Sequence, residues 1–248
     1  MNKLKYLMTT VLALTVEGTV SCSARGKVYL VAVGIADYPG DKNNLRFTVN
    51  DAKDVAWLFG KSKDTETVLL TDKDATAENI RQKASELYRR ADSEDRVIFF
   101  FSGHGYRGGF NAYDGKLGYD DVKHAMALGK AKCRMLLADA CYAGKIRTAK
   151  RNGNMSGDND DKHLYFLSCR SSEKSMEAAG AGRGFFTMVL VKGLRGGADS
   201  DGNRIITAQE LFTFVSSNVA KLTKDKQHPV MWGKFDKDMP VISWTGKH

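Results

Sequence analysis

Short runs of consecutive apolar residues constrain the fold of this chain more than any other feature of its sequence. Residues 27–35 (KVYLVAVGI), 96–101 (RVIFFF) and 133–138 (CRMLLA) are mostly apolar at successive positions. Because neighbouring side chains of a strand point to opposite faces, such strands are buried on both faces. Segments with helical spacing lie between them. The pattern predicts an α/β fold: a three-layer sandwich around a mostly parallel central sheet of about six strands.

Helical patterns and further strands complete this alternation. Residues 66–70, 164–167 and 241–244 are the other expected strands. Thr76 is of a residue type that caps helices, and an apolar stripe at helical spacing follows it. Neither an internal repeat nor an interdomain linker interrupts the pattern, which predicts one folded domain over residues 25–248. The expected helices cover 49–59, 76–91, 120–128, 185–194 and 207–222.

Residues 1–24 have the features of an export segment. Two lysines precede an apolar run over residues 6–16, which is too short to span a bilayer. Residues 19–22 (TVSC) resemble a bacterial lipoprotein signal in which Cys22 would carry the lipid. The alternative is a plain secretory peptide that is cut after Ala24. We therefore expect export from a bacterial cell, as a membrane-anchored lipoprotein or as a periplasmic or secreted protein.

The charge pattern argues against a nucleic-acid partner. The formal net charge is +9, but the 38 Lys and Arg residues are dispersed among 29 acids. The densest basic run, residues 145–151 (KIRTAKR), is short and is followed by three aspartates. A basic stripe with interleaved aromatic residues is absent from the sequence. Solubility, or attraction to anionic surfaces, is the better inference from the net charge.

The four cysteines do not have the spacing of a disulfide framework. They are Cys22, Cys133, Cys141 and Cys169. Cys133 lies near the start of one expected strand and Cys169 at the end of the next, on the order of 20 Å apart if the strands are parallel. A disulfide needs Cα atoms within roughly 7 Å, so a disulfide between Cys133 and Cys169 is excluded. At least one free thiol is therefore expected.

Two expected strands end in residues that can carry out chemistry. The strand over 96–101 runs into Ser102, Gly103, His104 and Gly105, and the strand over 133–138 runs into Asp139, Ala140 and Cys141. In sheets of this kind, function gathers at the carboxyl ends of the strands. If the two strands are neighbours, about 4.8 Å apart, His104 and Cys141 meet at one edge.

This pairing is what thiol catalysis requires. A thiolate is the nucleophile, and a nearby imidazole lowers the thiol pKa or delivers a proton to the leaving group. The backbone N–H groups of Gly105 and Cys141 are placed to point at a developing oxyanion. A lone cysteine at a strand end is most often packing, and a lone histidine is usually structural. The combination of His104, directly followed by a glycine, and Cys141, with a glycine three residues later, favours catalysis.

The sequence resembles the caspase-like cysteine peptidases, and most closely the metacaspases and their bacterial relatives. The resemblance rests on FFFSGHG and LLADACYAG, supported by NDAKDV, GFFT and QHPVMWG, and it runs from Lys27 to the C-terminus. It implies the caspase-hemoglobinase fold, a peptidase domain over residues 25–248, and a catalytic dyad of His104 and Cys141.

The resemblance also implies a pocket for the substrate residue before the cleaved bond. Its lining would be Asp51 in NDA, Ser102 before the histidine, and Asp139 before the cysteine. Strand alternation agrees for Asp139, because it lies two residues before Cys141 and points the same way. Carboxylates in a pocket select Arg, by bidentate pairing, or Lys. For Asp51, a solvated helix residue is the open alternative.

No cofactor and no metal site is predicted, although calcium remains an open alternative. Residues 199–210 (DSDGNRIITAQE) nearly fit an EF-hand loop, but Arg204 occupies the position where the sharp turn requires glycine. This favours a plain acidic turn before a helix. Some metacaspases need calcium near the dyad. Asp114, Asp120 and Asp121 are the candidate ligands here, while Thr148 stands where a further acid would be expected.

The leading hypothesis is an exported cysteine endopeptidase that cuts protein or peptide substrates after Arg or Lys and binds no nucleic acid. Membrane contact would come only through the lipid on Cys22. The alternatives are a catalytically silent scaffold on the same fold and another thiol-dependent hydrolase or transferase. The stretch 142–161 is longer than a usual connection. We expect self-cleavage there, at Lys150 or Arg151.

Overall fold

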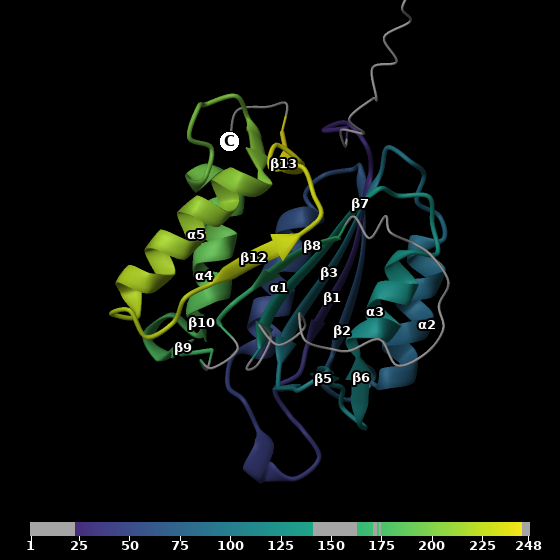
Figure 1. Cartoon of the computed structure of the whole chain (residues 1–248). Coiled ribbons are helices and arrows are strands. Elements are labelled where there is room, and N and C mark those ends of the chain that lie inside the picture. Colours follow the sequence, from purple (N-terminus) through teal and green to yellow (C-terminus); the bar gives the residue numbers. More distant parts are fainter. Residues whose placement is uncertain (1–22, 141–162, 171–172, 174, 245–248) are drawn as a thin grey trace, which may run out of the picture.

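The protein was analysed as a computed structural model that describes residues 23–140, 163–170, 173 and 175–244. Cys22, Cys141, Lys150 and Arg151 therefore lie outside the described residues. A twisted central sheet has helices on both faces, as the apolar strands predicted (Figure 1). In the described ranges, no helix is both long enough and apolar enough to cross a bilayer.

The central sheet has six strands in the order β12-β8-β7-β3-β1-β2. Five of them are parallel, and β12 pairs antiparallel with β8 at one edge. The expected α/β sandwich with a mostly parallel sheet is confirmed. The strands are β1 (Val28–Gly34), β2 (Thr65–Thr71), β3 (Arg96–Gly103), β7 (Cys133–Ala140), β8 (His163–Leu167) and β12 (Val230–Gly233).

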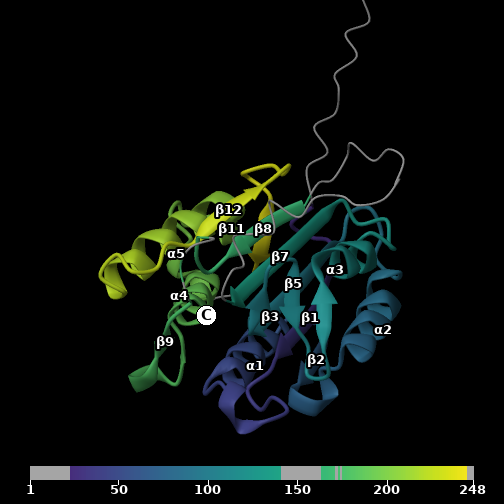
Figure 2. The same ribbon diagram turned by 60° about the horizontal axis from the view of Figure 1, so that its bottom comes forward.

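Helices cover both faces of the sheet (Figures 1 and 2). Each face has its own buried core, because every central strand presents apolar side chains to both sides. The expected cap is present: the Thr76 hydroxyl accepts from the Asn79 N–H at 3.2 Å. One layer has α1 (Thr48–Phe59), α4 (Phe185–Lys192) and α5 (Ala208–Leu222); the other has α2 (Ala77–Tyr88) and α3 (Tyr119–Met126).

Short elements surround the two ends of the sheet. A three-stranded hairpin sheet follows β3 at the carboxyl end, and it consists of β4 (Gly105–Tyr106), β5 (Gly109–Asn111) and β6 (Lys116–Gly118). Two further pairs are β9 (Glu177–Ala178) with β10 (Arg183–Gly184) and β11 (Ile205–Thr207) with β13 (Pro240–Ser243). Single-turn or short helical segments are η1 (Asp41–Asn43), η2 (Asp72–Asp74), η4 (Ala179–Ala181) and η5 (Gly193–Gly197).

The edge strand of the sheet is not the one that the sequence indicated. The expected strand near 241–244 forms as β13, but it pairs with β11 outside the central sheet. The sixth place belongs to β12, which the sequence analysis did not predict. Its residues, VMWG, show neither a long apolar run nor clear alternation. Trp232 stacks on Tyr165 of β8 with ring centroids 4.1 Å apart, a cross-strand contact that only the pairing creates.

Candidate active site

The carboxyl ends of β3 and β7 lie side by side. Ser102 is in register with Asp139, and Gly103 with Ala140. The expectation that these two strands are neighbours is therefore confirmed. Cys141 is the residue directly after β7 and lies outside the described residues. His104 directly follows β3, so the chain brings both predicted catalytic positions to the ends of adjacent parallel strands.

A backbone carbonyl fixes the ring of His104. The Nε2 atom lies 2.7 Å from the carbonyl oxygen of Asn43, in η1. Because a carbonyl oxygen only accepts hydrogen bonds, Nε2 must carry the proton in this contact. Nδ1 is then the basic nitrogen of the neutral ring. No sequence pattern points to Asn43, since a backbone acceptor can come from any residue.

Tyr38 holds the backbone of the histidine. The His104 N–H donates to the Tyr38 hydroxyl oxygen at 2.9 Å, and that hydroxyl donates to the Asn111 carbonyl at 3.2 Å. The two rings are 4.9 Å apart between centroids. A side chain at Gly103 would place its Cβ 2.7 Å from the Tyr38 hydroxyl, so glycine is required there. Gly105 opens β4 and pairs with Phe110.

Two buried carboxylates lie beside the histidine strand. Asp51 is 1% exposed and Asp139 is 5% exposed. Asp51 accepts from the Ser102 hydroxyl at 2.8 Å and from the Gly184 N–H at 3.1 Å. The burial of Asp51 excludes the alternative of a solvated helix residue. The structure thus brings together Asp51, Ser102 and Asp139.

Asp139 is held by residues from two later segments. Its Oδ2 atom accepts from the Thr187 N–H at 3.1 Å and from the Thr187 hydroxyl at 2.8 Å. Its Oδ1 atom accepts from the Ser175 hydroxyl. Because Thr187 is in the first turn of α4, this helix begins at the carboxylate and presents a backbone N–H to it.

The two carboxylates flank the same point in space. A Cβ added at Gly184 would collide with Asp139 and would lie 3.2 Å from Asp51 Oδ2. Burial, and then the negative charge of Asp139, raise the pKa of Asp51 to about 8. Burial likewise raises the pKa of Asp139. Within the described part of the chain, neither carboxylate has a salt bridge, and the neighbouring Arg183 pairs with Asp54 instead.

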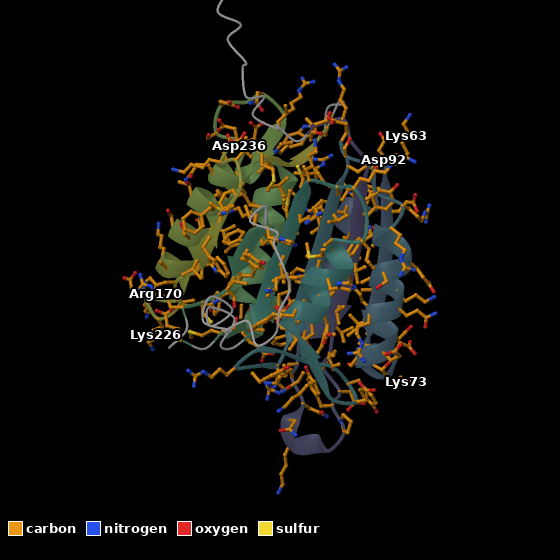
Figure 3. All side chains as sticks on the ribbon, turned by 45° about the vertical axis from the view of Figure 1, so that its right-hand side comes forward. Lys63, Lys73, Asp92, Arg170, Lys226 and Asp236 are labelled. Carbon is orange, nitrogen blue, oxygen red and sulfur yellow. The ribbon has the colours of Figure 1, made fainter. Side chains whose placement is uncertain are left out.

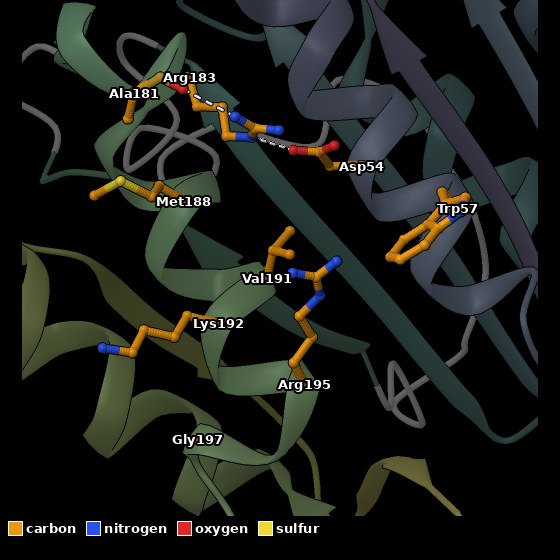
Figure 4. A pocket seen from close by; sticks show the side chains of 9 residues that line it. All are labelled: Asp54, Trp57, Ala181, Arg183, Met188, Val191, Lys192, Arg195 and Gly197. Carbon is orange, nitrogen blue, oxygen red and sulfur yellow. Dashed lines mark hydrogen bonds and ion pairs between the residues drawn. The ribbon is translucent and has the colours of Figure 1, made fainter. Parts of the chain in front are cut away.

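That ion pair anchors the strand that carries Gly184. Arg183 bonds Asp54 through Nε, and its Nη1 donates to the Ala181 carbonyl at 2.8 Å (Figure 4). The pair lies at one end of an open cavity of 580 Å³ between α1 and α4, which also includes Trp57. The Arg195 guanidinium lies 5.0 Å from the Trp57 ring centroid. Asp54 and Arg183 therefore fix β10 from the outside while Gly184 donates to Asp51 from within.

The residues that orient Asp139 could not be predicted from the sequence. Thr187 lies in GFFT and Gln227 in QHPVMWG, two stretches that had supported the family resemblance without an assigned role. Gln227 is fully buried, and its Nε2 donates to the Ser168 carbonyl at 2.8 Å. Its Oε1 accepts from the Met176 N–H at 3.0 Å, which fixes the segment that contains Ser175. No local pattern links these residues to an aspartate dozens of positions earlier.

The candidate calcium ligands have other partners. Asp114 accepts from the Ala77 N–H at the start of α2, and Asp121 accepts from the Gly118 N–H at the start of α3. Asp120 forms an ion pair with Lys123 at 2.5 Å. In the described ranges, the one group of acidic side chains close enough together for a metal ion is Asp199, Asp201 and Glu210. These oxygens accept from nearby backbone and hydroxyl groups; Asp199, for example, accepts from Gly202 N–H and Arg204 N–H.

Comparison with protein families decides the classification. Residues 27–240 match the family model described as Caspase domain. The chain belongs to the caspase family. Members of this family are cysteine-type peptidases, and the resemblance to the caspase-like peptidases is thereby confirmed. The match covers the whole folded domain from β1 to the start of β13.

Metacaspases are among the relatives of this caspase-family chain. It is 27% identical to Metacaspase-4 of Arabidopsis thaliana over 188 residues, which is 62% of this chain and 45% of that protein. It is 38% identical to Metacaspase-1 of Meyerozyma guilliermondii over 114 residues, 41% of this chain and 26% of the relative. The chain thus spans less than half the length of these curated relatives.

A protein of known structure shares the fold of this chain. A Geobacter sulfurreducens protein of known crystal structure superposes with a TM-score of 0.66 at 15% sequence identity. The match covers 88% of this chain and 100% of the other chain. At this identity the likeness concerns the fold alone.

Proposed function

We propose that this caspase-family protein is a cysteine endopeptidase that cleaves peptide bonds after Arg or Lys. The observation that carries the proposal is the pair of buried carboxylates at the edge where His104 lies. Asp51 and Asp139 face one point, and neither has a salt bridge in the described ranges. A guanidinium or ammonium group entering between them would supply the missing countercharge.

The proposed mechanism uses Cys141 as nucleophile and His104 as base. His104 Nδ1 takes the thiol proton because Nε2 is committed to the Asn43 carbonyl. The thiolate attacks the scissile carbonyl, and the N–H groups of Gly105 and Cys141 stabilise the oxyanion. The protonated His104 then donates to the leaving amine, which departs and leaves an acyl-enzyme. Water, deprotonated by the same ring, hydrolyses the thioester and restores Cys141.

A matched set of peptides tests both the chemistry and the specificity. Fluorogenic peptides that differ only in having Arg, Lys, Asp or Ala before the cut would be assayed with wild type, Cys141→Ala and His104→Ala. We expect cleavage of the Arg and Lys peptides by wild type alone. Activity of Cys141→Ala within tenfold of wild type would place the nucleophile elsewhere. A preference for Asp would overturn the pocket assignment, and an inactive wild type would favour the scaffold alternative.

The proposal includes self-processing in the stretch that follows Cys141. Residues 142–161 offer Lys145, Arg147, Lys150 and Arg151, which match the proposed specificity. We expect a cut after Lys150 or Arg151, with both fragments held together through the sheet. Incubation of wild type beside Cys141→Ala on a denaturing gel distinguishes the outcomes. Two bands from both proteins would implicate a contaminating protease, and one band from both would exclude self-processing.

We propose that catalysis requires no cofactor. Sulfur and imidazole chemistry supplies both the nucleophile and the proton transfer without a metal. The direct test is the rate of Arg-peptide cleavage in EDTA and in millimolar calcium. Equal rates are expected, and a rate that depends on calcium would reopen Asp114, Asp120 and Asp121 as ligands.

The fate of Cys22 bears on the proposed export. Cys133 forms a disulfide with a partner outside the described residues, while Cys169 keeps a buried thiol. The partner of Cys133 is therefore Cys22 or Cys141, both of which lie outside the described residues.

A disulfide and a thioether-linked lipid on Cys22 exclude each other. Mass spectrometry of the exported protein, digested without reduction, distinguishes the two. A linked peptide containing Cys22 and Cys133 would favour a periplasmic or secreted protein. A diacylglyceryl group on Cys22 would establish the lipoprotein, with membrane contact through that anchor alone.

A further inference from the structure

A second cavity lies at the amino end of the central sheet, away from the catalytic edge. It has a volume of 720 Å³, within the range of pockets that bind small organic molecules. It is bounded by the first residues of β1 and β2, the end of α1, and the pair β11 and β13. In Figure 1 this end of the molecule is the one at which β13 lies, opposite the β5–β6 hairpin.

A buried arginine lines this cavity. Arg96, the first residue of β3, is 4% exposed. Its Nη1 donates to the Val241 carbonyl at 3.3 Å, and its Nη2 donates to Gly26 at 2.9 Å and to Ala24 at 3.3 Å. The Nε–H is buried and has no hydrogen-bond partner. The guanidinium is therefore incompletely satisfied.

The charge of Arg96 is also incompletely compensated. Burial lowers its pKa to about 10, and the partial compensation by Asp95 is smaller than this effect. The Asp95 carboxylate itself accepts from the Lys27 and Asp92 N–H groups. Within the described residues Arg96 bonds only to neutral carbonyl oxygens. A buried cation in this state gains from an anion that enters the adjacent space.

Further cations surround the opening. Arg25, Lys61, Lys63 and Arg204 contribute to the lining, and Asp64 is the one acidic residue in it. Lys63 projects at this end of the molecule (Figure 3). The summed field of such a set attracts anions to the cavity.

Arg204 is held at the rim in an unusual backbone conformation. Its φ is +66°, a region that few residues other than glycine adopt. The Asp199 carboxylate accepts from the Arg204 N–H at 3.1 Å, and the Trp244 N–H donates to the Arg204 carbonyl at 3.2 Å. The acidic loop that resembles an EF-hand thus fixes an arginine beside the cavity.

The lining also includes apolar side chains, beside four uncharged polar ones. The half-buried Ile242 and Trp244 offer apolar surface to the cavity, and the buried core residues Val28, Leu58, Phe59 and Leu194 lie behind it. A ligand with an apolar body would cover this surface while its charged head meets the arginine. Inorganic anions alone would leave the apolar wall in contact with water.

We propose that this cavity binds an organic anion, with a carboxylate or phosphate head toward Arg96 and an apolar body against Ile242 and Trp244. The site is separate from the peptidase centre and does not depend on the proposed specificity. Its chemistry requires both parts of the ligand, because the positive lining recognises the head and the apolar wall recognises the body.

Calorimetric titration of the full-length Cys141→Ala protein tests this proposal. The probes are octanoate and octyl phosphate, which carry both parts, and octan-1-ol and inorganic phosphate, which each lack one. We expect both octyl anions to bind at least tenfold more tightly than octanol or inorganic phosphate. Stronger binding of one octyl anion than the other identifies the preferred head group.

Charge-reversed variants locate the binding. The double variant Arg25→Glu/Lys63→Glu removes two rim cations, and we expect octanoate affinity to fall at least tenfold. The matched control is Lys73→Glu/Lys221→Glu, which changes the net charge equally at exposed lysines outside the cavity lining, and we expect less than a twofold change. Arg96→Met should abolish binding, and if it does not fold, the rim variants still decide.

Four outcomes would overturn the proposal. Equal binding of octanol and octanoate would mean that charge is not recognised. Equal binding of inorganic and octyl phosphate would mean that the apolar wall is not used. An equal loss of affinity in the rim and control variants would mean that only net charge attracts the probe, and no binding at millimolar octanoate would exclude the site.

Discussion

The two ends of the central sheet hold buried charges of opposite sign. At the carboxyl end, Asp51 and Asp139 lie beside the histidine strand. At the amino end, Arg96 opens the same strand, β3, and is buried to a similar degree. Neither end has a salt bridge for these groups within the described part of the chain. One strand therefore links an anionic site and a cationic site at its two ends.

The ends differ in how hydrogen bonds satisfy the charge. The carboxylates accept from Ser102, Gly184, Thr187 and Ser175, so their oxygens are held in fixed directions. Arg96 donates to three carbonyls and leaves Nε without a partner. A fully oriented pair suits a cation of defined geometry, whereas an incompletely satisfied arginine suits any anion that supplies an acceptor. This contrast is the one expected if the proposed substrate pocket is selective and the proposed anion cavity is less selective.

The largest expected effect comes from removing a charge at the carboxyl end. Asp139→Asn keeps the shape of the side chain but loses a charge-assisted contact with the substrate. The contact contributes on the order of 1.5–3 kcal/mol, so kcat/KM for Arg peptides should fall about 10- to 150-fold. Steady-state kinetics checks this. An unchanged kcat/KM in a folded variant would show that the substrate cation binds elsewhere.

The second effect is the pH dependence of the same pocket. Because the pKa of Asp51 is raised to about 8, the carboxylate pair keeps a proton below that pH. A cationic substrate binds best when the proton has left, so kcat/KM for Arg peptides should rise roughly tenfold per pH unit up to about 8. In Asp51→Asn this rise of kcat/KM with pH should disappear, although kcat/KM at pH 8 should be lower than in wild type. A rise that persists in Asp51→Asn would belong to the titration of another group.

A smaller effect concerns the orientation of the carboxylate. Thr187→Val removes the hydroxyl that donates to Asp139 but keeps the backbone N–H and the side-chain volume. Loss of one charge-assisted bond should lower kcat/KM for Arg peptides about threefold to tenfold. Thr187→Ser retains the hydroxyl and should stay within twofold of wild type. If kcat/KM fell equally in Thr187→Val and Thr187→Ser, the effect would come from packing rather than from the hydrogen bond.

The smallest expected effect is on how the thermal stability of the protein depends on pH. The pKa of Asp51 is raised in the fold, so between about pH 4 and pH 8 the native state holds a proton that the unfolded chain has lost. Raising the pH through this window therefore destabilises the fold. Arg96, with a pKa of about 10, stays charged throughout. Asp51→Asn should flatten the fall in Tm between pH 5 and 8.5 by a few degrees, and Arg96→Lys should retain it.

Local sequence patterns predicted the parallel strands of the central sheet but not its antiparallel edge strand. The parallel strands were predicted because they are apolar on both faces, and they form within about two residues of the expected bounds. The edge strand β12 was not predicted, because its four residues contain neither a long apolar run nor clear alternation. Edge pairing with β8 depends on contacts such as that between Tyr165 and Trp232, which no local window contains.

The residues of the candidate site also divide into those that were predicted from the sequence and those that were not. His104 follows from the rule that function gathers at the carboxyl ends of neighbouring parallel strands, and the register of β3 with β7 agrees. The pocket roles of Asp51 and Asp139 followed from family resemblance, with which strand alternation agreed for Asp139. Asn43, Thr187, Ser175 and Gln227 could not be assigned roles, because each acts on a residue far away in sequence.

The sequence by itself determined the layers of this protein and the two strands that end in chemistry. Apolar periodicity is a local property, and the glycines around His104 are visible in a few residues. The tertiary structure alone decided that Asp51 and Asp139 face each other without a salt bridge in the described ranges, and that Arg96 is buried beside a basic cavity. The physical reason is that a charge is costly only when folding removes water and partners from it, and that depends on every segment that packs around it.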